Sequence, residues 1–280
     1  MAVVSQMWCN YPRSRLPAHT VLMGKVRRAR RCCPPGVCEG VSMVSALSRR
    51  ALLGYTAAAV AAGAVGSALG TSRAGAASLG TLLDYAGGVP SAAAIKAAGH
   101  TGVIRYVSDR RPGAEWMVGK PLLAGEVEDL RSAGLAIVSC YQFGKGPTAD
   151  WRGGYDAGCR HAERGLALHR AAGGPENRPI YASIDDNPNP VEFATMILPY
   201  LLGWQAVSGR ENTGVYANAP TIDLARTAGV GAWFWQHDWG TAPGYVHPAA
   251  HLHQFEIDDR TVDGVGVDVN DIRAAEYGAW

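Results

Sequence analysis

The chain has 280 residues, of which 48% are hydrophobic and 18% charged, and its formal net charge is +2. This length allows one large domain or two small ones, and the composition excludes a disordered chain and a coiled coil. Residues 1–76 hold ten basic residues and one acid, which leaves 16 basic and 23 acidic residues, a net charge of −7, in residues 77–280. Because phosphate binding requires a basic face, a nucleic-acid partner is disfavoured for residues 77–280.

Residues 43–76 have the features of a signal peptide for the twin-arginine export route. The sequence Ser48-Arg49-Arg50 precedes an uncharged stretch, 51–70, that is rich in Ala and Gly, and Ala74-Gly75-Ala76 fits a small-residue cleavage site. The alternative is a retained anchor, because about 20 residues can span a bilayer. We therefore expect the twin-arginine translocase as an export partner and a location in the periplasm, the cell wall or the medium, with membrane association if the signal is retained.

Residues 1–42 differ in character from this signal. Met43 lies five residues before Ser48, as an initiator with a short leading segment would. We interpret residues 1–42 as an extension from a misassigned gene start or as a disordered segment, with a basic tail or a zinc knuckle as alternatives. The spacing of Cys32, Cys33 and Cys38 lacks the Cys-x-x-Cys pairing that a zinc site favours, which makes the knuckle the weaker alternative.

Strand-like and helix-like stretches alternate along residues 77–280. Eight apolar stretches bounded by turn residues have the length of strands: 81–85, 102–108, 136–142, 179–186, 213–218, 232–238, 251–256 and 265–272. Five stretches with helical spacing, each followed by glycine, lie between the earlier strands: 91–98, 125–133, 151–172, 191–208 and 221–228. No comparable helix pattern separates the last three strands.

This order predicts an α/β fold, a TIM-like (β/α) barrel of eight strands that forms a single domain over residues 77–280. Helices are expected after the first five strands only, followed by a helix-poor C-terminal closure that is partly antiparallel if the short gaps cannot support parallel crossovers. A doubly wound sheet is the alternative, but no Gly-x-Gly-x-x-Gly follows the first strand. Cys140 and Cys159 are expected either to pair outside the cell or to be two buried thiols.

Polar and aromatic residues gather at the ends of the predicted strands, where a barrel of this kind carries its chemistry. Carboxylates can act as acids and bases, amides can bind hydroxyl groups, and aromatic rings can stack on pyranose rings. We predict a sugar site with the catalytic carboxylates Asp84, Asp185, Asp268 and Glu256. Its predicted substrate-binding residues are Tyr106, Tyr141, Gln142, Asn187, Tyr216, Asn218, Trp235, Gln236 and Gln254.

Some of these residues also have simpler interpretations. Tyrosines at strand ends are more often packing residues, and Glu256 is followed by Asp258 and Asp259, so it fits an exposed acidic loop as well as a site. Asp268 fits a backbone-bonding role at barrel closure equally well.

Six short stretches along these strands resemble one known family. They are Leu82-Leu83-Asp84-Tyr85, Ile180-Tyr181-Ala182-Ser183-Ile184-Asp185, Gly214-Val215-Tyr216-Ala217-Asn218, Trp235-Gln236, His253-Gln254 and Gly266-Val267-Asp268-Val269-Asn270. In this order they resemble the glycoside-hydrolase-like domain of exported actinobacterial proteins, domain of unknown function 1906, which is similar to the muramidases of glycoside hydrolase family 25. The resemblance spans most of residues 79–277. It implies a barrel with five helices followed by three strands without helices.

The resemblance also implies a gap in the catalytic set. The muramidase fourth strand ends in Asp-x-Glu, where the Glu is the general acid; Asp185 matches the Asp, and Asn187 stands at the Glu position. An amide cannot donate a proton to a leaving group at neutral pH. Asp84 and Asp268 match family acids on the first and last strands, so either is a possible partner for Asp185.

We therefore expect an exported, monomeric protein that hydrolyses glycosidic bonds in a cell-envelope polysaccharide, either peptidoglycan or arabinogalactan, through paired carboxylates. A glycan-binding pseudo-enzyme that has lost the acid is the main alternative. A metal-dependent hydrolase that uses His251 and His253 is a minor one, since His-x-His places both rings on one face of a strand. We expect no cofactor and no metal ion.

Overall fold

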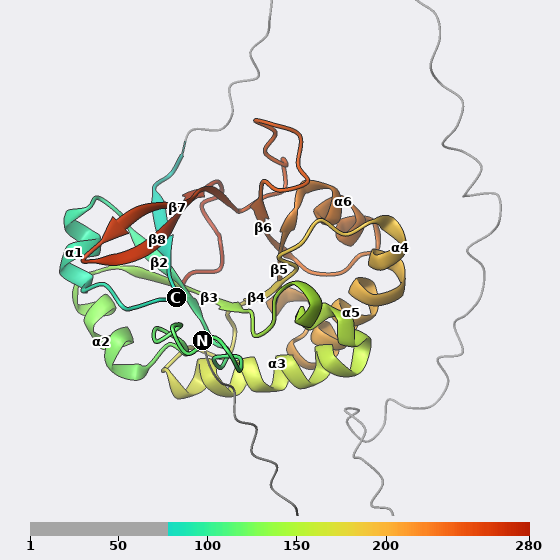
Figure 1. Ribbon diagram of the computed structural model, residues 1–280, viewed down its shortest axis with the longest axis horizontal. Helices are drawn as coiled ribbons and strands as arrows, with labels where there is room; N and C mark the ends of the chain where they lie inside the picture. Colours follow the sequence, from blue (N-terminus) through green and yellow to red (C-terminus); the bar gives the residue numbers. More distant parts are fainter. Residues whose placement is uncertain (1–77) are drawn as a thin grey trace, which may run out of the picture. The chain divides into compact units, whose positions relative to one another are not determined.

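The computed structural model describes residues 78–280, in which eight strands close into a barrel in chain order (Figure 1). The predicted signal peptide and the segment 1–42 lie outside the described residues and stay predictions. The strands are β1 Thr81–Asp84, β2 Gly102–Tyr106, β3 Ala136–Tyr141, β4 Ile180–Ser183, β5 Thr213–Asn218, β6 Trp233–His237, β7 Leu252–Val262 and β8 Val265–Ile272.

Helices separate the first six strands and none separates the last three. They are α1 Ala92–Ala97, α2 Ala124–Ser132, α3 Gly154–Ala171, α4 Pro190–Glu192, which continues through π-helical Phe193–Ile197 into α5 Leu198–Ser208, and α6 Ala219–Thr227. Short 3₁₀ turns cover Gly146–Thr148, Asp150–Gly153 and Arg210–Asn212. The predicted barrel, with helices after the first five strands only, is confirmed.

Local chemistry explains where the helices begin and end. The side chain of Asn218 accepts the backbone N–H of Thr221 and caps α6, and Asn189 caps α4 in the same way. A capping oxygen satisfies an N–H that the first helical turn leaves without a partner. Gly99 and Gly173 follow α1 and α3 with φ values of 89° and 90°, a region that glycine enters at low cost. The expected glycine stops are thus real helix ends.

The barrel closes through an antiparallel hairpin. Strands β1 to β7 pair in parallel, whereas β7 pairs antiparallel with β8, and β8 pairs antiparallel with β1. Asp263 and Gly264 connect β7 to β8 with φ values of 52° and 77°. Positive φ at both central residues is the geometry that favours an Asp-Gly hairpin. This two-residue turn replaces a crossover helix, so the closure is both helix-poor and partly antiparallel.

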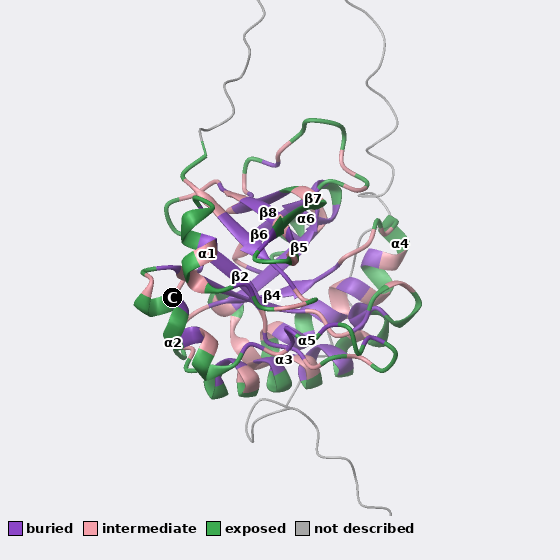
Figure 2. Ribbon diagram, turned by 60° about the vertical axis from the view of Figure 1, so that its left-hand side comes forward, coloured by how far each residue is buried: buried purple, intermediate pink, exposed green. Residues whose placement is uncertain are grey.

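Alternate residues of the strands face two different cores. Leu82, Ile104, Val138 and Tyr181 belong to one buried cluster with Trp235, while Leu83 and Val103 belong to another with residues of α1 and α2. In Figure 2 the strands are largely buried and the outer surfaces of the helices are exposed. This alternation is the period of two that a strand buried on both faces requires. Alternate residues of each strand therefore point into the barrel or toward the helices around it.

The two cysteines of the barrel lie in different layers. Cys140 packs in the same cluster as Tyr181, whereas Cys159 is on α3. Both are buried thiols rather than a disulfide. Within residues 78–280, none of the helices combines the length and the hydropathy needed to cross a bilayer.

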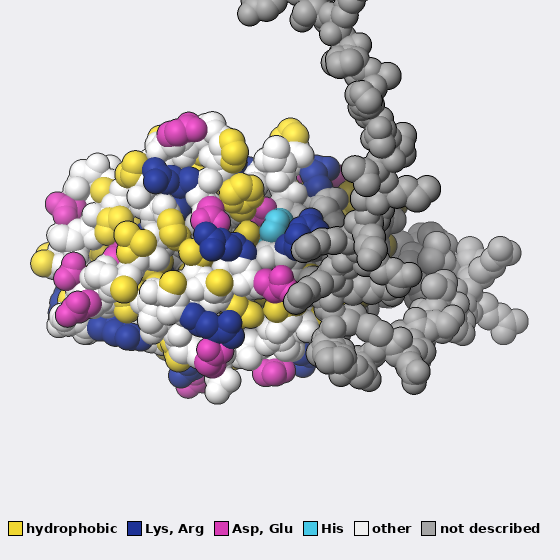
Figure 3. Space-filling model, turned by 90° about the horizontal axis from the view of Figure 1, so that it is seen from below, with side chains coloured by type: hydrophobic (Ala, Val, Ile, Leu, Met, Phe, Trp, Pro, Cys, Tyr) yellow, Lys and Arg dark blue, Asp and Glu magenta, His cyan; other side chains and the backbone are white. Residues whose placement is uncertain are grey.

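Charges of both signs are mixed on the surface drawn in Figure 3. Lys and Arg side chains alternate there with Asp and Glu side chains, and apolar side chains lie between them. Among the described residues, two exposed pairs are bidentate, Arg164 with Asp109 and Arg170 with Glu176, with N–O distances of 2.7–2.8 Å. The described part of this face therefore lacks the continuous positive charge that a phosphate backbone attracts.

Candidate active site

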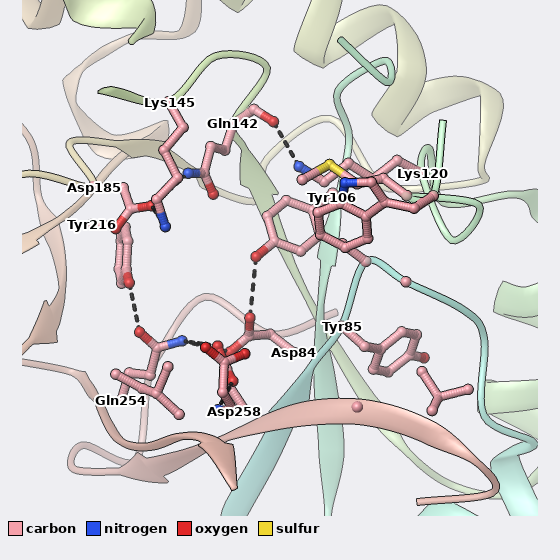
Figure 4. A pocket seen from close by; sticks show the side chains of 18 of the residues that line it. Asp84, Tyr85, Tyr106, Lys120, Gln142, Lys145, Asp185, Tyr216, Gln254 and Asp258 are labelled. Carbon is pink, nitrogen blue, oxygen red and sulfur yellow. Dashed lines mark hydrogen bonds and ion pairs between the residues drawn. The ribbon is translucent and has the colours of Figure 1, made fainter. Parts of the chain in front are cut away.

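A pocket of about 420 Å³ opens where the strands end (Figure 4). Side chains from β1, β2, β5, β7 and β8, and from the segments that follow β3 and β4, line it. The predicted site residues that the structure brings together here are Asp84, Tyr106, Gln142, Asp185, Tyr216, Gln254 and Asp268.

Asp84 lies at the buried end of the pocket, with 3% of its surface exposed. Its carboxylate accepts hydrogen bonds from Tyr106 Oη at 3.1 Å, Gln254 Nε2 at 3.0 Å and Asn270 Nδ2 at 2.8 Å. Burial raises the pKa of Asp84, and these three donors oppose that rise because they favour the charged form. Three donors on one carboxylate are the environment of an ionised group.

Asp268 stands directly opposite Asp84 in the antiparallel pair of β1 and β8. Gln254 Nε2 lies 3.0 Å from an oxygen of each carboxyl group, so the two oxygens are at most about 6 Å apart. The other oxygen of Asp268 accepts the backbone N–H of Asp258 at 2.9 Å. Burial and the charge of Asp84 raise the pKa of Asp268 to about 7.

Asp84 and Asp268 thus form a pair of neighbouring carboxyl groups, and the charge of Asp84 contributes to the raised pKa of Asp268. Two carboxylates at this separation resist ionising together, so the member with fewer donors keeps the proton. Asp84 has three side-chain donors, while Asp268 has one backbone N–H and a shared amide. We therefore place the proton on Asp268, which is half-buried and lines the pocket.

Asp185 follows β4 and is another predicted carboxylate that lines the pocket. Its Oδ2 accepts from Gln142 Nε2 at 2.8 Å and faces the ammonium of Lys145 at 2.9 Å. Its Oδ1 is buried and has no hydrogen-bond partner among residues 78–280. A buried acceptor without a partner is costly, so this oxygen is available to a bound ligand.

A second tier of hydrogen bonds fixes these carboxylates. Tyr216 Oη donates to Gln254 Oε1 at 2.5 Å, which orients the Gln254 amide toward the two aspartates. Trp235 Nε1 donates to Asn270 Oδ1 at 2.8 Å. Trp235 is buried and does not line the pocket. The structure places this predicted substrate residue beneath the site, where it orients Asn270.

Several other predicted site residues also have partners away from the pocket. Tyr141 packs against Trp204 outside the barrel, because it precedes Gln142 and a strand alternates its faces. Gln236 binds the segment between β6 and β7 through the N–H of His247 at 2.7 Å and the carbonyl of Tyr245 at 2.8 Å. Neither side chain lines the pocket.

Glu256, Asn187 and Asn218 likewise do not line the pocket. Glu256 forms a bidentate ion pair with Arg260 at 2.6 and 2.9 Å on the β7–β8 hairpin, as the acidic-loop interpretation expects. Asn218 is engaged as the cap of α6, and its Nδ2 donates to Asn187 Oδ1 at 2.9 Å. Asn187 itself is exposed. The residue that the muramidase resemblance aligns with a general acid is therefore an amide that is turned toward α6.

The pocket also contains residues that the sequence reasoning missed. Loops supply most of them: Arg111, Trp116 and Lys120 after β2, Lys145 after β3, and Trp239 after β6; strand β7 supplies Asp258. A sequence pattern gives no signal for the direction in which such a loop folds. Asp258 was visible only as part of the acidic run next to Glu256.

The histidines considered for a metal site are separately engaged. The Nδ1 of His251 lies 3.1 Å from the backbone N–H of Phe234, and His253 Nε2 lies 2.8 Å from Asp238 Oδ1. Among residues 78–280, no group of three or more His, Cys, Asp or Glu side chains is arranged to hold a metal ion. The His-x-His pair therefore does not assemble the donor set that the minor alternative needs.

The raised pKa of Asp268 predicts a pH-dependent cost to stability. A carboxyl group with a folded pKa near 7 and an ordinary value of 3.8 stabilises the fold below pH 4, and this contribution is lost as the pH rises through 7. We expect the free energy of unfolding of Asp268→Asn, measured relative to that of the wild type, to rise by roughly 1–3 kcal/mol from pH 4 to pH 8. Thermal unfolding of both proteins at the two pH values measures this difference. The exposed Asp259→Asn is the matched control, and a difference independent of pH would contradict the assignment.

A closed barrel with carboxylates, amides and aromatic rings at the ends of its strands defines a glycoside hydrolase-like protein. A family model described as "Rv2525c-like, glycoside hydrolase-like domain" matches residues 93–272. A protein of Mycobacterium tuberculosis (strain ATCC 25618 / H37Rv) named "Putative peptidoglycan hydrolase Rv2525c" is 58% identical over 237 residues, which are 84% of this chain and 99% of that protein. The chain therefore belongs to the family of Rv2525c-like, glycoside hydrolase-like domains, as its sequence motifs predicted.

Solved structures show the same architecture. A crystal structure of the Tat-secreted protein Rv2525c of Mycobacterium tuberculosis in complex with L-tartrate is 62% identical, with a TM-score of 0.72, and the match covers 72% of this chain and all of that one. An uncharacterized B. stearothermophilus protein has a similar fold at 18% identity, with a TM-score of 0.51, over 70% of this chain and 96% of that one.

Proposed function

We propose that this protein hydrolyses glycosidic bonds in a cell-envelope polysaccharide, with the glycan strand of peptidoglycan as its substrate. The observation that carries the proposal is the carboxyl pair of the pocket: Asp268 lines the pocket opposite Asp84, and Gln254 Nε2 lies 3.0 Å from an oxygen of each. Burial and the charge of Asp84 raise the pKa of Asp268 to about 7, which suits a proton donor. Asp185 lines the same pocket beside an ammonium group. The peptidoglycan hydrolase name of the 58% identical relative supports the choice of substrate.

The three carboxyl groups suit distinct roles in this reaction. Glycoside hydrolysis needs one carboxylic acid to protonate the leaving oxygen and one carboxylate to act at the anomeric carbon or to activate water. Asp268 is the proton donor and Asp185 is the carboxylate. Asp84 stays ionised beneath Asp268 and raises its pKa, so the proton is held where the leaving group needs it. This arrangement supplies the acid that the amide of Asn187 cannot.

Aromatic side chains complete the case for a sugar ligand. Trp116 lies at the pocket with 60% of its surface exposed, and Trp239 lines it while stacked on His237 at 3.9 Å between ring centroids. An exposed aromatic face beside hydrogen-bonding side chains is the usual composition of a pyranose site. We assign Trp116 and Trp239 as stacking platforms for sugar units.

A glycan-binding protein without catalysis is the second candidate. The exposed amide of Asn187 at the family's acid position favours it. Digestion of purified peptidoglycan separates the two: the hydrolase releases muropeptides with new reducing ends, whereas the binding protein co-sediments with peptidoglycan and releases none. Activity that is lost on chelation would instead revive the metal-dependent alternative.

Export is proposed through the twin-arginine route, with the periplasm, the cell wall or the medium as destination. The 62% identical protein that is described as Tat-secreted supports this proposal. We expect Arg49→Lys together with Arg50→Lys to abolish export, because that route reads the adjacent guanidinium pair. Fractionation of the producing cells measures the result, with Arg73→Lys as the control that keeps export. Normal export of the double variant would indicate another route.

A further inference from the structure

The basic side chains of the pocket are separated from its buried acid pair. Figure 4 shows Lys120 and Lys145 beside Gln142 on one side of the pocket, with Asp84, Asp258 and Gln254 on the other. Lys145 is already paired with Asp185. The charges of Lys120 and of Arg111, which also lines the pocket, are not used by the proposed hydrolysis.

Lys120 is a buried ammonium, with 4% of its surface exposed. Its Nζ donates to the backbone carbonyl of Gln142 at 2.9 Å and lies 3.9 Å from the ring centre of Tyr106. No carboxylate of the described residues lies within ion-pair distance of it. An ammonium has three protons to donate, so this one keeps donor capacity. Burial and the nearby charges of Arg111 and Arg105 lower the pKa of Lys120 to about 8.

Arg111 is half-buried in the loop after β2. In the part of the chain that the structure describes, its guanidinium has no hydrogen bond and no ion pair. Both cations act electrostatically on the carboxyl group of Asp150. The Asp150 carboxylate is committed elsewhere, because it accepts the backbone N–H groups of Phe143 at 2.8 Å and Gly144 at 2.9 Å. Two neighbouring cations therefore face a sugar pocket without an anion of their own.

We propose that Arg111 and Lys120 bind a free carboxylate on the sugar unit held in the pocket, so that the protein selects an acidic amino sugar. In a peptidoglycan strand that unit is a muramic acid residue whose lactyl carboxylate carries no peptide. A peptide-substituted residue presents a neutral amide at the same place and leaves both cations unpaired. This inference rests on the proposed function and adds a preference for strands from which the peptides have been removed.

Guanidinium and ammonium groups form hydrogen bonds with carboxylates that are about twice as strong as neutral ones. Water and salt also screen such charged pairs less in a partly buried site than in open solvent. We therefore expect the free carboxylate to improve binding by about tenfold or more.

Direct binding tests this without requiring turnover. Calorimetry on the full chain compares N-acetylmuramic acid, its carboxamide, N-acetylglucosamine and N-acetylglucosamine 6-phosphate. We expect N-acetylmuramic acid to bind about tenfold more tightly than its carboxamide. Arg111→Gln should remove this difference, Arg111→Lys should retain part of it, and Arg110→Gln, an exposed neighbour that does not line the pocket, should keep all of it.

Turnover supplies the second readout. Peptidoglycan strands treated with an amidase carry free lactyl carboxylates, and a carbodiimide with ammonia converts these to amides. The wild type should cleave the former about tenfold faster in kcat/KM, and Arg111→Gln should lower this ratio toward one. If neither strand is cleaved while the binding preference holds, the hydrolase proposal fails and the carboxylate site stands. Equal binding of acid and carboxamide, or preference for the 6-phosphate alone, overturns the inference.

Discussion

Asp268→Asn is expected to reduce kcat/KM on peptidoglycan by about 10²–10⁴-fold, because positioned general acids contribute that much. The substitution keeps the shape of the side chain and its hydrogen bond to the Asp258 N–H, but it removes the proton that protonates the leaving oxygen. Release of reducing ends measures the effect. The wild-type rate should also fall as the pH rises through about 7, where the Asp268 carboxyl loses its proton.

The leaving group provides the decisive control for this assignment. The nitrophenolate of a nitrophenyl glycoside leaves without being protonated. The loss of kcat/KM that Asp268→Asn causes should therefore be much smaller on this substrate than on peptidoglycan. The exposed Asp259→Asn should match the wild type on both substrates. Equal losses on both substrates would show that Asp268 is not the proton donor.

Asp185→Ala is the second change with a large expected effect, a loss of roughly 10²–10³-fold in kcat, comparable to the removal of one preorganised electrostatic partner. Asp185 lines the pocket, and one of its oxygens has no partner in the described part of the chain, so we assign this carboxylate to the cationic transition state. The assay is again the release of reducing ends from peptidoglycan. Lys145→Met is the matched variant, because it removes the ion pair but leaves the carboxylate.

Added azide distinguishes this role from simple loss of structure. A small anion can occupy the space of the missing carboxylate and attack the anomeric carbon, so the variant should recover activity and form a glycosyl azide. Full activity of Asp185→Ala without azide would remove Asp185 from the mechanism. A folded variant that azide does not rescue would favour a binding role for Asp185.

The barrel was predictable because its determinants are local. A glycine follows each helical stretch between the first six strands, and most strands are apolar stretches of the predicted length, so element order followed from spacing. Strand β7 is the exception, because it continues past the predicted end at Glu256 through exposed charged residues to Val262. The last three strands were harder to assign, because the gaps were too short for crossovers and gave no pairing direction. The turn at Asp263 and Gly264 resolved this, since it imposes an antiparallel hairpin.

The site was only partly predictable, because position at a strand end does not decide the face. Tyr141 and Gln142 are adjacent, yet only Gln142 reaches the pocket, since a strand turns alternate residues to opposite sides. Trp235 faces inward but lies too deep to line the pocket, and it acts through Asn270 instead. Asn218 and Gln236 form hydrogen bonds with neighbouring segments, Asn218 with Asn187 and Gln236 with the carbonyl of Tyr245.

The sequence by itself determined the net negative charge of residues 77–280, the number and order of their elements, and the presence of Asp84, Asp185 and Asp268 at strand ends. These features depend on composition and on short-range spacing. Only the tertiary structure decided that Asp84 and Asp268 share one amide donor and that burial beside Asp84 raises the pKa of Asp268. It also placed Arg111 and Lys120 in the same pocket. Both depend on contacts between segments far apart in the chain, where the pKa of a carboxyl group is set by burial and by its neighbours rather than by its position in the sequence.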